Sequence, residues 1–280
     1  MKTIVTFVAF SAVTVLITEG ANKRPICNQN SSYDWYEYYS HSDINDFIDG
    51  LACANSNWVK TVSIGRTYES REMRVIEINK AGPEAPIAWI EAGIHAREWI
   101  SSATATYIIN ELVNNYQENK DIVDNLNIHI LPMANPDGYE FSRTDGFYNR
   151  KWRKNRNPNN NCTWTCLFYN LIGQSCGIGV DLNRNWDFHW GESTTTSDNP
   201  YLKLKRRNDN GPCSEKYHGP HPFSEAETVN IKNYLESLNQ VPVLGLALHS
   251  HNQLWLWPYG YAKNARPYNY IENVSLYCFV

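Results

Sequence analysis

The sequence predicts an α/β fold in which a mixed, mostly parallel central sheet carries helices on both faces. Four short apolar runs are typical of strands, and they lie at 74–78, 86–91, 128–133 and 243–248. Several of these runs lack polar alternation, which indicates strands that are buried on both faces. Segments with helical periodicity lie between the runs, and alternating strands and helices build sheets that are covered on both sides.

The first elements follow in chain order. Strands at 74–78 and 86–91 lead into a helix, where apolar side chains recur every three or four residues at Ile100, Ala103, Tyr107, Ile108, Leu112 and Tyr116. The run at 128–133 is the third strand. The segment at 145–222 is rich in Asn, Gly, Pro and Trp and has little periodicity, which predicts a long loop region with a functional role.

A second helix and a last strand follow the loop region. Ser224 and Glu227 have the spacing of a capping box, and the apolar residues after them keep helical spacing at Val229, Tyr234, Leu235 and Leu238. The run at 243–248 completes the predicted sheet. No internal repeat is visible along the chain.

Residues 1–20 have the composition of a secretory signal peptide, with Lys2 ahead of a short apolar stretch and small residues after it. Residues 21–280 form one predicted domain, because no linker divides them. The net charge of -4 and the pI near 6.1 argue against a nucleic-acid-binding protein. No later run is long and apolar enough for a membrane span. We therefore expect a secreted, extracellular monomer.

The cysteines agree with an oxidising compartment, where disulfides persist. There are seven, so they cannot all pair within one chain: Cys27, Cys53, Cys162, Cys166, Cys176, Cys213 and Cys278. Acceptor sequons for glycosylation begin at Asn30, Asn161 and Asn273.

The residues that carry chemistry are two histidines and a glutamate. His95 and Glu98 follow one strand-like run and His249 follows another, and ligands gather at the carboxyl ends of strands in α/β sheets. Two imidazoles and one carboxylate leave the fourth position of a zinc ion open for water, as catalytic sites require. An isolated His-x-x-Glu occurs by chance, so this interpretation depends on the accompanying motifs.

Those motifs occur in a fixed order: His95-Ala-Arg-Glu-Trp99, Asn135-Pro-Asp-Gly-Tyr139, Lys151-Trp-Arg-Lys154, Asp181-Leu-Asn-Arg-Asn-Trp186, Pro212-Cys-Ser-Glu-Lys-Tyr-His-Gly219, His249-Ser-His-Asn-Gln253 and Trp257-Pro-Tyr-Gly260. From about Tyr33 to about Tyr270 the chain resembles the zinc metallocarboxypeptidase family, that of carboxypeptidases A and B. The resemblance implies an enzyme that removes single C-terminal residues from peptides or proteins, with Zn²⁺ held by His95, Glu98 and His249.

The same resemblance implies roles for five more residues. Asp181 would orient the first histidine ligand, and Arg153 would meet the developing oxyanion. Asn183 and Arg184 would hold the carboxylate at the substrate's end, for which the planar fork of arginine is suited. Arg97 would line a more distant subsite. Without the resemblance, Asp181 would be interpreted as a turn cap and the arginines as surface charges.

Several features depart from the family pattern. His251 stands where an aromatic residue is more usual, and it could lie in a subsite or compete with His249 for the metal. The segment at 162–174 looks inserted, and the family pairing of Cys213 would be with Cys176 or Cys162. Gly260 slightly favours the specificity of carboxypeptidase A over that of carboxypeptidase B.

The family's mobile tyrosine and its glutamate base lie several tens of residues beyond the third ligand and have no counterpart here. Glu272 follows His249 too closely to be that base. The resemblance therefore predicts a domain that is incomplete at its carboxyl end, lacks a helix and a strand of the family sheet, and has no pro-segment. One alternative is a non-catalytic isoform that binds zinc and peptide carboxylates without turnover. A zinc-dependent deacylase fits less well, because it would not need so complete a carboxylate clamp.

Overall fold

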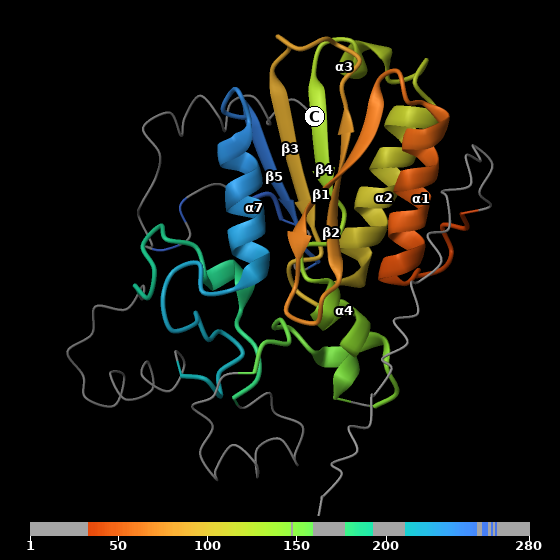
Figure 1. Cartoon of the computed structure of the whole chain (residues 1–280). Coiled ribbons are helices and arrows are strands. Elements are labelled where there is room, and N and C mark those ends of the chain that lie inside the picture. The colour runs from red at the N-terminus through yellow and green to blue at the C-terminus, as the bar shows by residue number, and fades with distance from the viewer. Residues whose placement is uncertain are drawn as a thin grey trace, which may run out of the picture.

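A computed structural model of the chain describes residues 33–146, 148–158, 177–192, 211–250, 254–256, 259 and 261. Its centre is a five-stranded sheet with the order β1-β2-β4-β3-β5 (Figure 1). The strands are β1 Val59–Arg66, β2 Glu72–Ile78, β3 Ile87–Ala92, β4 Asn127–Leu131 and β5 Leu244–Leu248. All four predicted strands are therefore present, together with β1, which the apolar runs did not indicate.

The sheet is mixed. β1 pairs with β2 and β2 with β4 in the antiparallel sense, whereas β3 runs parallel to both β4 and β5. The predicted α/β class with a mixed sheet is confirmed, and the sheet is open. Among the described strands the pairings divide evenly between the two senses, so the parallel share is smaller there than expected.

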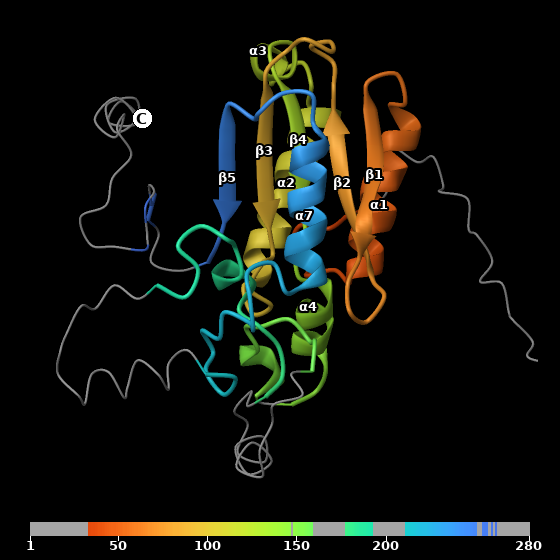
Figure 2. The ribbon, with the colours of Figure 1, turned by 60° about the vertical axis from the view of Figure 1, so that its left-hand side comes forward.

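Helices cover both faces of the sheet, as predicted (Figure 2). The three long helices are α1 His41–Ala54, α2 Trp99–Asn114 and α7 Ala226–Ser237, and shorter ones are α3 Lys120–Val123 and α4 Pro136–Arg143. α1 and α2 lie on one face, and α7 lies on the other. The described parts of the predicted loop region contain only two single turns of 3₁₀ helix, η1 Asn149–Lys151 and η2 Leu182–Arg184.

The alternation of side chains along β2 divides the core into two layers. Ile76 and Ile78 pack with residues of α1 and α2. Met73 and Val75 point to the opposite face, where they pack with Ile231 of α7. Because successive strand residues point to opposite faces, a strand between two helical layers needs apolar side chains on both of its faces.

The predicted capping box at the start of α7 is wrong. The N-cap residue is Glu225, no described side chain of its own segment caps the helix, and Ser224 Oγ donates instead to Glu225 Oε1 at 2.7 Å. Asn185, which belongs to a distant loop, supplies an acceptor at the start of α7 instead. Its Oδ1 accepts from Glu225 N at 3.2 Å and from Thr228 Oγ1 at 2.8 Å. Glu227 is fully buried and accepts from another side chain, so it is not the reciprocal half of a box.

Several sequence predictions fall outside the described residues. These are the signal peptide at 1–20, the three sequons, the segment at 162–174, His251, Gly260 and Glu272. Cys53 and Cys213 are both disulfide-bonded, and the two candidate partners of Cys213 also lie outside the described residues. None of the described helices combines the length and the apolar character that a bilayer span needs.

Candidate metal centre

The two histidines lie at one edge of the sheet because they follow neighbouring parallel strands. β3 and β5 are paired in register, with Ala92 opposite Leu248. His95 comes three residues after the end of β3 and His249 directly after β5. Figure 2 shows the two strands running side by side in the same direction. The topology thus brings together two residues that are far apart in the sequence.

The turn between β3 and α2 sets the position of His95 and Glu98. Gly93 has a φ of +67°, and a Cβ there would lie 2.5 Å from Ser102 Oγ, so both the conformation and the space favour glycine. Gly93 N donates to Ser101 Oγ at 3.0 Å, and that hydroxyl donates to the Glu98 carbonyl at 2.7 Å. These hydrogen bonds tie the beginning of α2 to the end of β3.

Three potential ligand groups converge at this edge. His95 Nδ1 lies 2.9 Å from Glu98 Oε1, and His249 Nδ1 lies 2.9 Å from Glu98 Oε2. One ligand atom from each residue falls within 4.8 Å of the others. His95 and Glu98 are buried, whereas the His249 side chain is 32% exposed, so the cluster opens to solvent on one side.

The hydrogen-bonding capacity of His95 fits a metal ion at this position. Its Nδ1 faces the Glu98 carboxylate, and its Nε2 lies 3.2 Å from Asp181 Oδ1. A neutral imidazole has one N–H, so it cannot donate to both carboxylates. A cation held by Nδ1 and Glu98 would replace the missing proton while Nε2–H continues to donate to Asp181. Two imidazoles and a carboxylate are also the donor set of many catalytic zinc sites.

Both carboxylates of the centre are stabilised as anions. Burial alone would raise the pKa of Glu98, but the hydrogen bonds from His249 and His95 outweigh it and hold the pKa far below its usual range. For Asp181, burial again opposes ionisation, while the hydrogen bond with His95 and the positive charge of Arg153 lower the pKa to about 2. The centre therefore offers one anionic ligand, Glu98, and an anionic support, Asp181, at neutral pH.

Arg153 and Asn183 lie around the same carboxylate. Arg153 donates to Asp181 Oδ2 from Nε at 3.0 Å and from Nη2 at 2.9 Å, and Asn183 N donates to Asp181 Oδ1 at 3.1 Å. Asn183 Nδ2 lies 3.5 Å from His249 Nε2. Arg184, on the same 3₁₀ turn, is exposed and donates from Nη1 to the Asn183 carbonyl at 2.8 Å.

The profile of the zinc carboxypeptidase family matches residues 44–277, which is most of the chain. The chain belongs to the zinc carboxypeptidase family. It is 38% identical over 233 residues to carboxypeptidase B of Astacus astacus, covering 82% of this chain and 67% of that protein. It is 36% identical over 240 residues to zinc carboxypeptidase A 1 of Drosophila melanogaster, covering 84% of this chain and 49% of that protein.

The fold agrees with that membership. Carboxypeptidase A from Helicoverpa armigera superimposes with a TM-score of 0.70 and 27% identity, covering 85% of this chain and 52% of that one. This chain thus spans between about half and two thirds of the length of the zinc carboxypeptidases that it matches.

The eight predicted site residues are all described. Six form one continuous network of contacts: His95, Glu98, Arg153, Asp181, Asn183 and His249. Arg184 joins it through the Asn183 carbonyl. Arg97 does not join this network. It turns to Glu215 Oε2 at 2.8 Å and to the Lys151 carbonyl at 3.2 Å.

Sequence reasoning missed three residues that bear on this candidate site. Ser250 N donates to Glu98 Oε2 at 3.2 Å, and Glu215 pairs with Arg97. Glu91 lies within β3, and burial raises the pKa of its carboxyl, although the nearby His249 opposes the shift. An acidic residue inside an apolar strand run was the available signal for Glu91. No local pattern distinguished the other two.

Proposed function

We propose that this chain is a secreted zinc metallocarboxypeptidase that removes single residues from the C-termini of peptides and proteins. The observation that carries the proposal is the proximity of two sets of residues. The potential ligands His95, Glu98 and His249 lie beside Asn183 and Arg184, which suit a terminal carboxylate. Secretion is supported by the composition of residues 1–20 and by the disulfide-bonded state of Cys53 and Cys213.

In this proposal His95, Glu98 and His249 hold Zn²⁺, which when bound supplies an acidified water and a polarised carbonyl. Asp181 fixes the tautomer of His95 by accepting from Nε2, so that Nδ1 is presented to the metal. The low pKa of Asp181 keeps it an acceptor throughout the neutral range.

Arg153 stabilises the oxyanion in this proposal. Its Nε and Nη2 are committed to Asp181, while its Nη1 forms no hydrogen bond to any of the described residues. One donor of the guanidinium is therefore available to a developing negative charge. A donor that is already held in place loses little freedom when that charge appears, which is what transition-state stabilisation requires.

Asn183 and Arg184 bind the substrate's terminal carboxylate. Arg184 is exposed, and only its Nη1 donates within the described part of the chain, to the Asn183 carbonyl. The rest of its fork is directed to no described acceptor and can donate to a carboxylate. The requirement for a free C-terminus follows directly from this pair.

The test measures zinc content, peptide binding and amino acid release on the full chain. Peptides with a free C-terminal carboxylate are compared with the same peptides as C-terminal amides. The proposal expects one bound zinc and release of the last residue from the free peptides alone. Equal hydrolysis of the free and the amidated peptides would favour a zinc-dependent deacylase. Absence of zinc would overturn the proposal.

A non-catalytic chain that binds zinc and peptide carboxylates remains the second candidate. It would use the same potential metal ligands and the same carboxylate-binding pair as the first candidate and would differ from it only in turnover. Stoichiometric zinc and binding of free-carboxylate peptides without any release would support this candidate, whereas sustained release at family-like rates would rule it out.

A further inference from the structure

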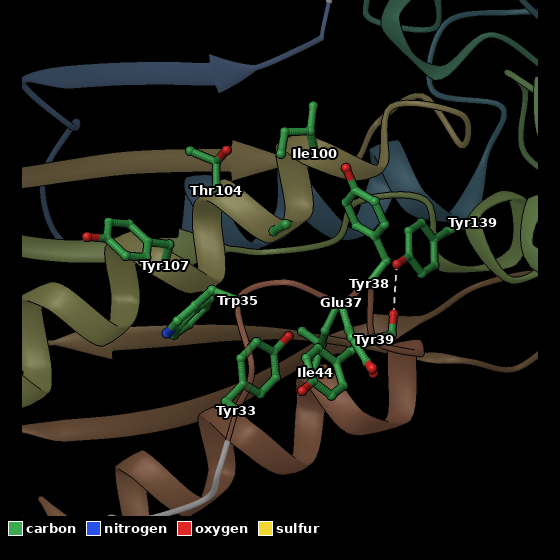
Figure 3. A pocket seen from close by; sticks show the side chains of 11 residues that line it. Tyr33, Trp35, Glu37, Tyr38, Tyr39, Ile44, Ile100, Thr104, Tyr107 and Tyr139 are labelled. Carbon is green, nitrogen blue, oxygen red and sulfur yellow. Dashed lines mark hydrogen bonds between the residues drawn. The ribbon is translucent and has the colours of Figure 1, made fainter.

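A pocket of about 210 Å³ lies between residues 33–39 and the outer side of α2 (Figure 3). Six of its lining residues are aromatic: Tyr33, Trp35, Tyr38, Tyr39, Tyr107 and Tyr139. Ile44 of α1 and three residues at the beginning of α2, Ile100, Ala103 and Thr104, supply most of the remainder. None of the proposed metal ligands or carboxylate-binding residues takes part.

The rings are held in place before any ligand arrives. Tyr33 stacks on Tyr39 with centroids 4.0 Å apart, and Trp35 meets Tyr107 edge-on at 5.4 Å. Tyr139 Oη donates to the Tyr39 carbonyl at 2.7 Å, the bond drawn in Figure 3. A pocket whose walls are already fixed loses little conformational freedom on binding.

The lining of the pocket carries one formal charge, which is negative. Glu37 is the only ionisable acid or base among the lining residues apart from the tyrosines, and it is exposed. Its carboxylate has no hydrogen bond or ion pair with the described part of the chain. The Arg143 guanidinium is not part of the lining but contacts two of its residues: it donates to the Tyr38 carbonyl at 2.8 Å and lies 5.5 Å from the Tyr139 ring.

We propose that this aromatic pocket binds a small organic cation of the alkylammonium class. The faces of Trp and Tyr rings carry negative partial charge and attract cations within about 6 Å, and groups of such rings recognise quaternary ammonium ions. The N-methyl groups would replace water against the rings, and Glu37 would supply the counter-charge. A neutral apolar ligand would use the rings alone and leave the carboxylate without a partner.

The trimethylammonium group of choline tests the proposal, because 3,3-dimethylbutanol has the same shape and no charge. Calorimetric titration of the full chain with each compound isolates the contribution of the charge. Choline is expected to bind at least about 10-fold more tightly than the neutral analogue, the scale of a desolvated cation–π contact. Equal affinities, or no binding of choline, would overturn the proposal.

Two variants test whether choline binds in this pocket. Glu37→Gln is expected to weaken choline binding by about 2- to 5-fold, the scale of an exposed ion pair, and to leave dimethylbutanol unchanged, because only the counter-charge is lost. Glu118→Gln, at another exposed acid with no described side-chain partner, is the matched control and should bind choline as the parent does. An unchanged affinity in Glu37→Gln, or an equal loss in the control, would show that the cation does not bind in this pocket.

Discussion

Both hydrogen bonds that Arg153 donates to Asp181 end on the same carboxylate oxygen, Oδ2, at 3.0 Å from Nε and 2.9 Å from Nη2. The other oxygen, Oδ1, lies 3.2 Å from His95 Nε2. One fully buried side chain therefore positions a proposed metal ligand and a proposed oxyanion donor at once. Changes at Asp181 should affect zinc affinity as well as turnover.

Asp181→Asn is expected to weaken zinc binding by roughly 10- to 100-fold, because the amide has only one acceptor oxygen for His95 and Arg153 and cannot enforce the same tautomer. Competition with a chromogenic chelator at fixed pH measures the loss. Asp187→Asn, an exposed acid six residues on, is the control and should retain parental affinity. Parental affinity in Asp181→Asn would mean that the backbone alone orients His95.

Arg184→Lys preserves the positive charge and removes the planar fork. Binding of a peptide with a free C-terminal carboxylate should weaken by roughly 10- to 100-fold, since a bidentate charge-assisted contact becomes a single one. Binding of the amidated peptide should not change. Arg150→Lys is the matched control, because the exposed Arg150 donates to the Arg97 carbonyl and not to the Asn183 turn. An undiminished affinity in Arg184→Lys would remove Arg184 from the proposed clamp.

Asn185→Ala is expected to destabilise the fold by roughly 2 to 4 kcal/mol, because Glu225 N loses its acceptor and the neighbouring groups each lose one hydrogen bond. Asn185 Nδ2 donates to the carbonyls of His218 and His221 at 2.9 and 3.2 Å, and its Oδ1 accepts from Glu225 N and Thr228 Oγ1. Urea unfolding measures the change. Asn114→Ala, at an exposed position of α2, should cost less than about 0.5 kcal/mol, and equal losses would contradict the capping role.

The central strands could be predicted because their signals are local, and the proximity of His95, Glu98 and His249 follows from the parallel pairing of β3 with β5. β2, β3 and β4 are covered on both faces, so apolar residues predominate in their sequences. β1 was not predicted, because it lies at the edge of the described sheet, has mixed burial and shifts register between Ser63 and Gly65. The alternation of apolar and polar residues along β1 is therefore interrupted. α1 had usable signals, since Ser40 and Asp43 do form a capping box there.

The start of α7 shows why other contacts could not be predicted. Ser224 and Glu227 have the right spacing for local caps, but Asn185, about forty residues earlier, supplies the acceptor instead. A side chain from a distant loop leaves no trace in the local pattern. The pairing of Arg97 with Glu215 has the same character, because the two residues are separated by 118 positions. Local spacing predicts which groups could interact, whereas the fold decides which do.

Glu227 makes the stability of the fold depend on pH. Burial, together with the negative charges of Glu225 and Asp137, raises the pKa of its carboxyl to about 8, although Asn155 donates to it. The ordinary pKa of a glutamate, 4.5, applies in the unfolded chain. Between these values the folded state binds a proton that the unfolded state releases, so this group makes stability fall as pH rises through that interval.

Glu227→Gln replaces the protonated carboxyl with a neutral group of the same shape and should remove this dependence. The urea midpoint of Glu227→Gln should exceed that of the parent by an amount that grows from about pH 5 to about pH 9. In this range only the parent must bury a charge or take up a proton on folding. Glu236→Gln on the same helix, with a 63% exposed side chain, is the control and should follow the parent throughout. A constant difference between Glu227→Gln and the parent across this range would mean that Glu227 is already ionised in the fold. The hydrogen bond from the Asn155 amide would then stabilise the carboxylate, and folding would not protonate it.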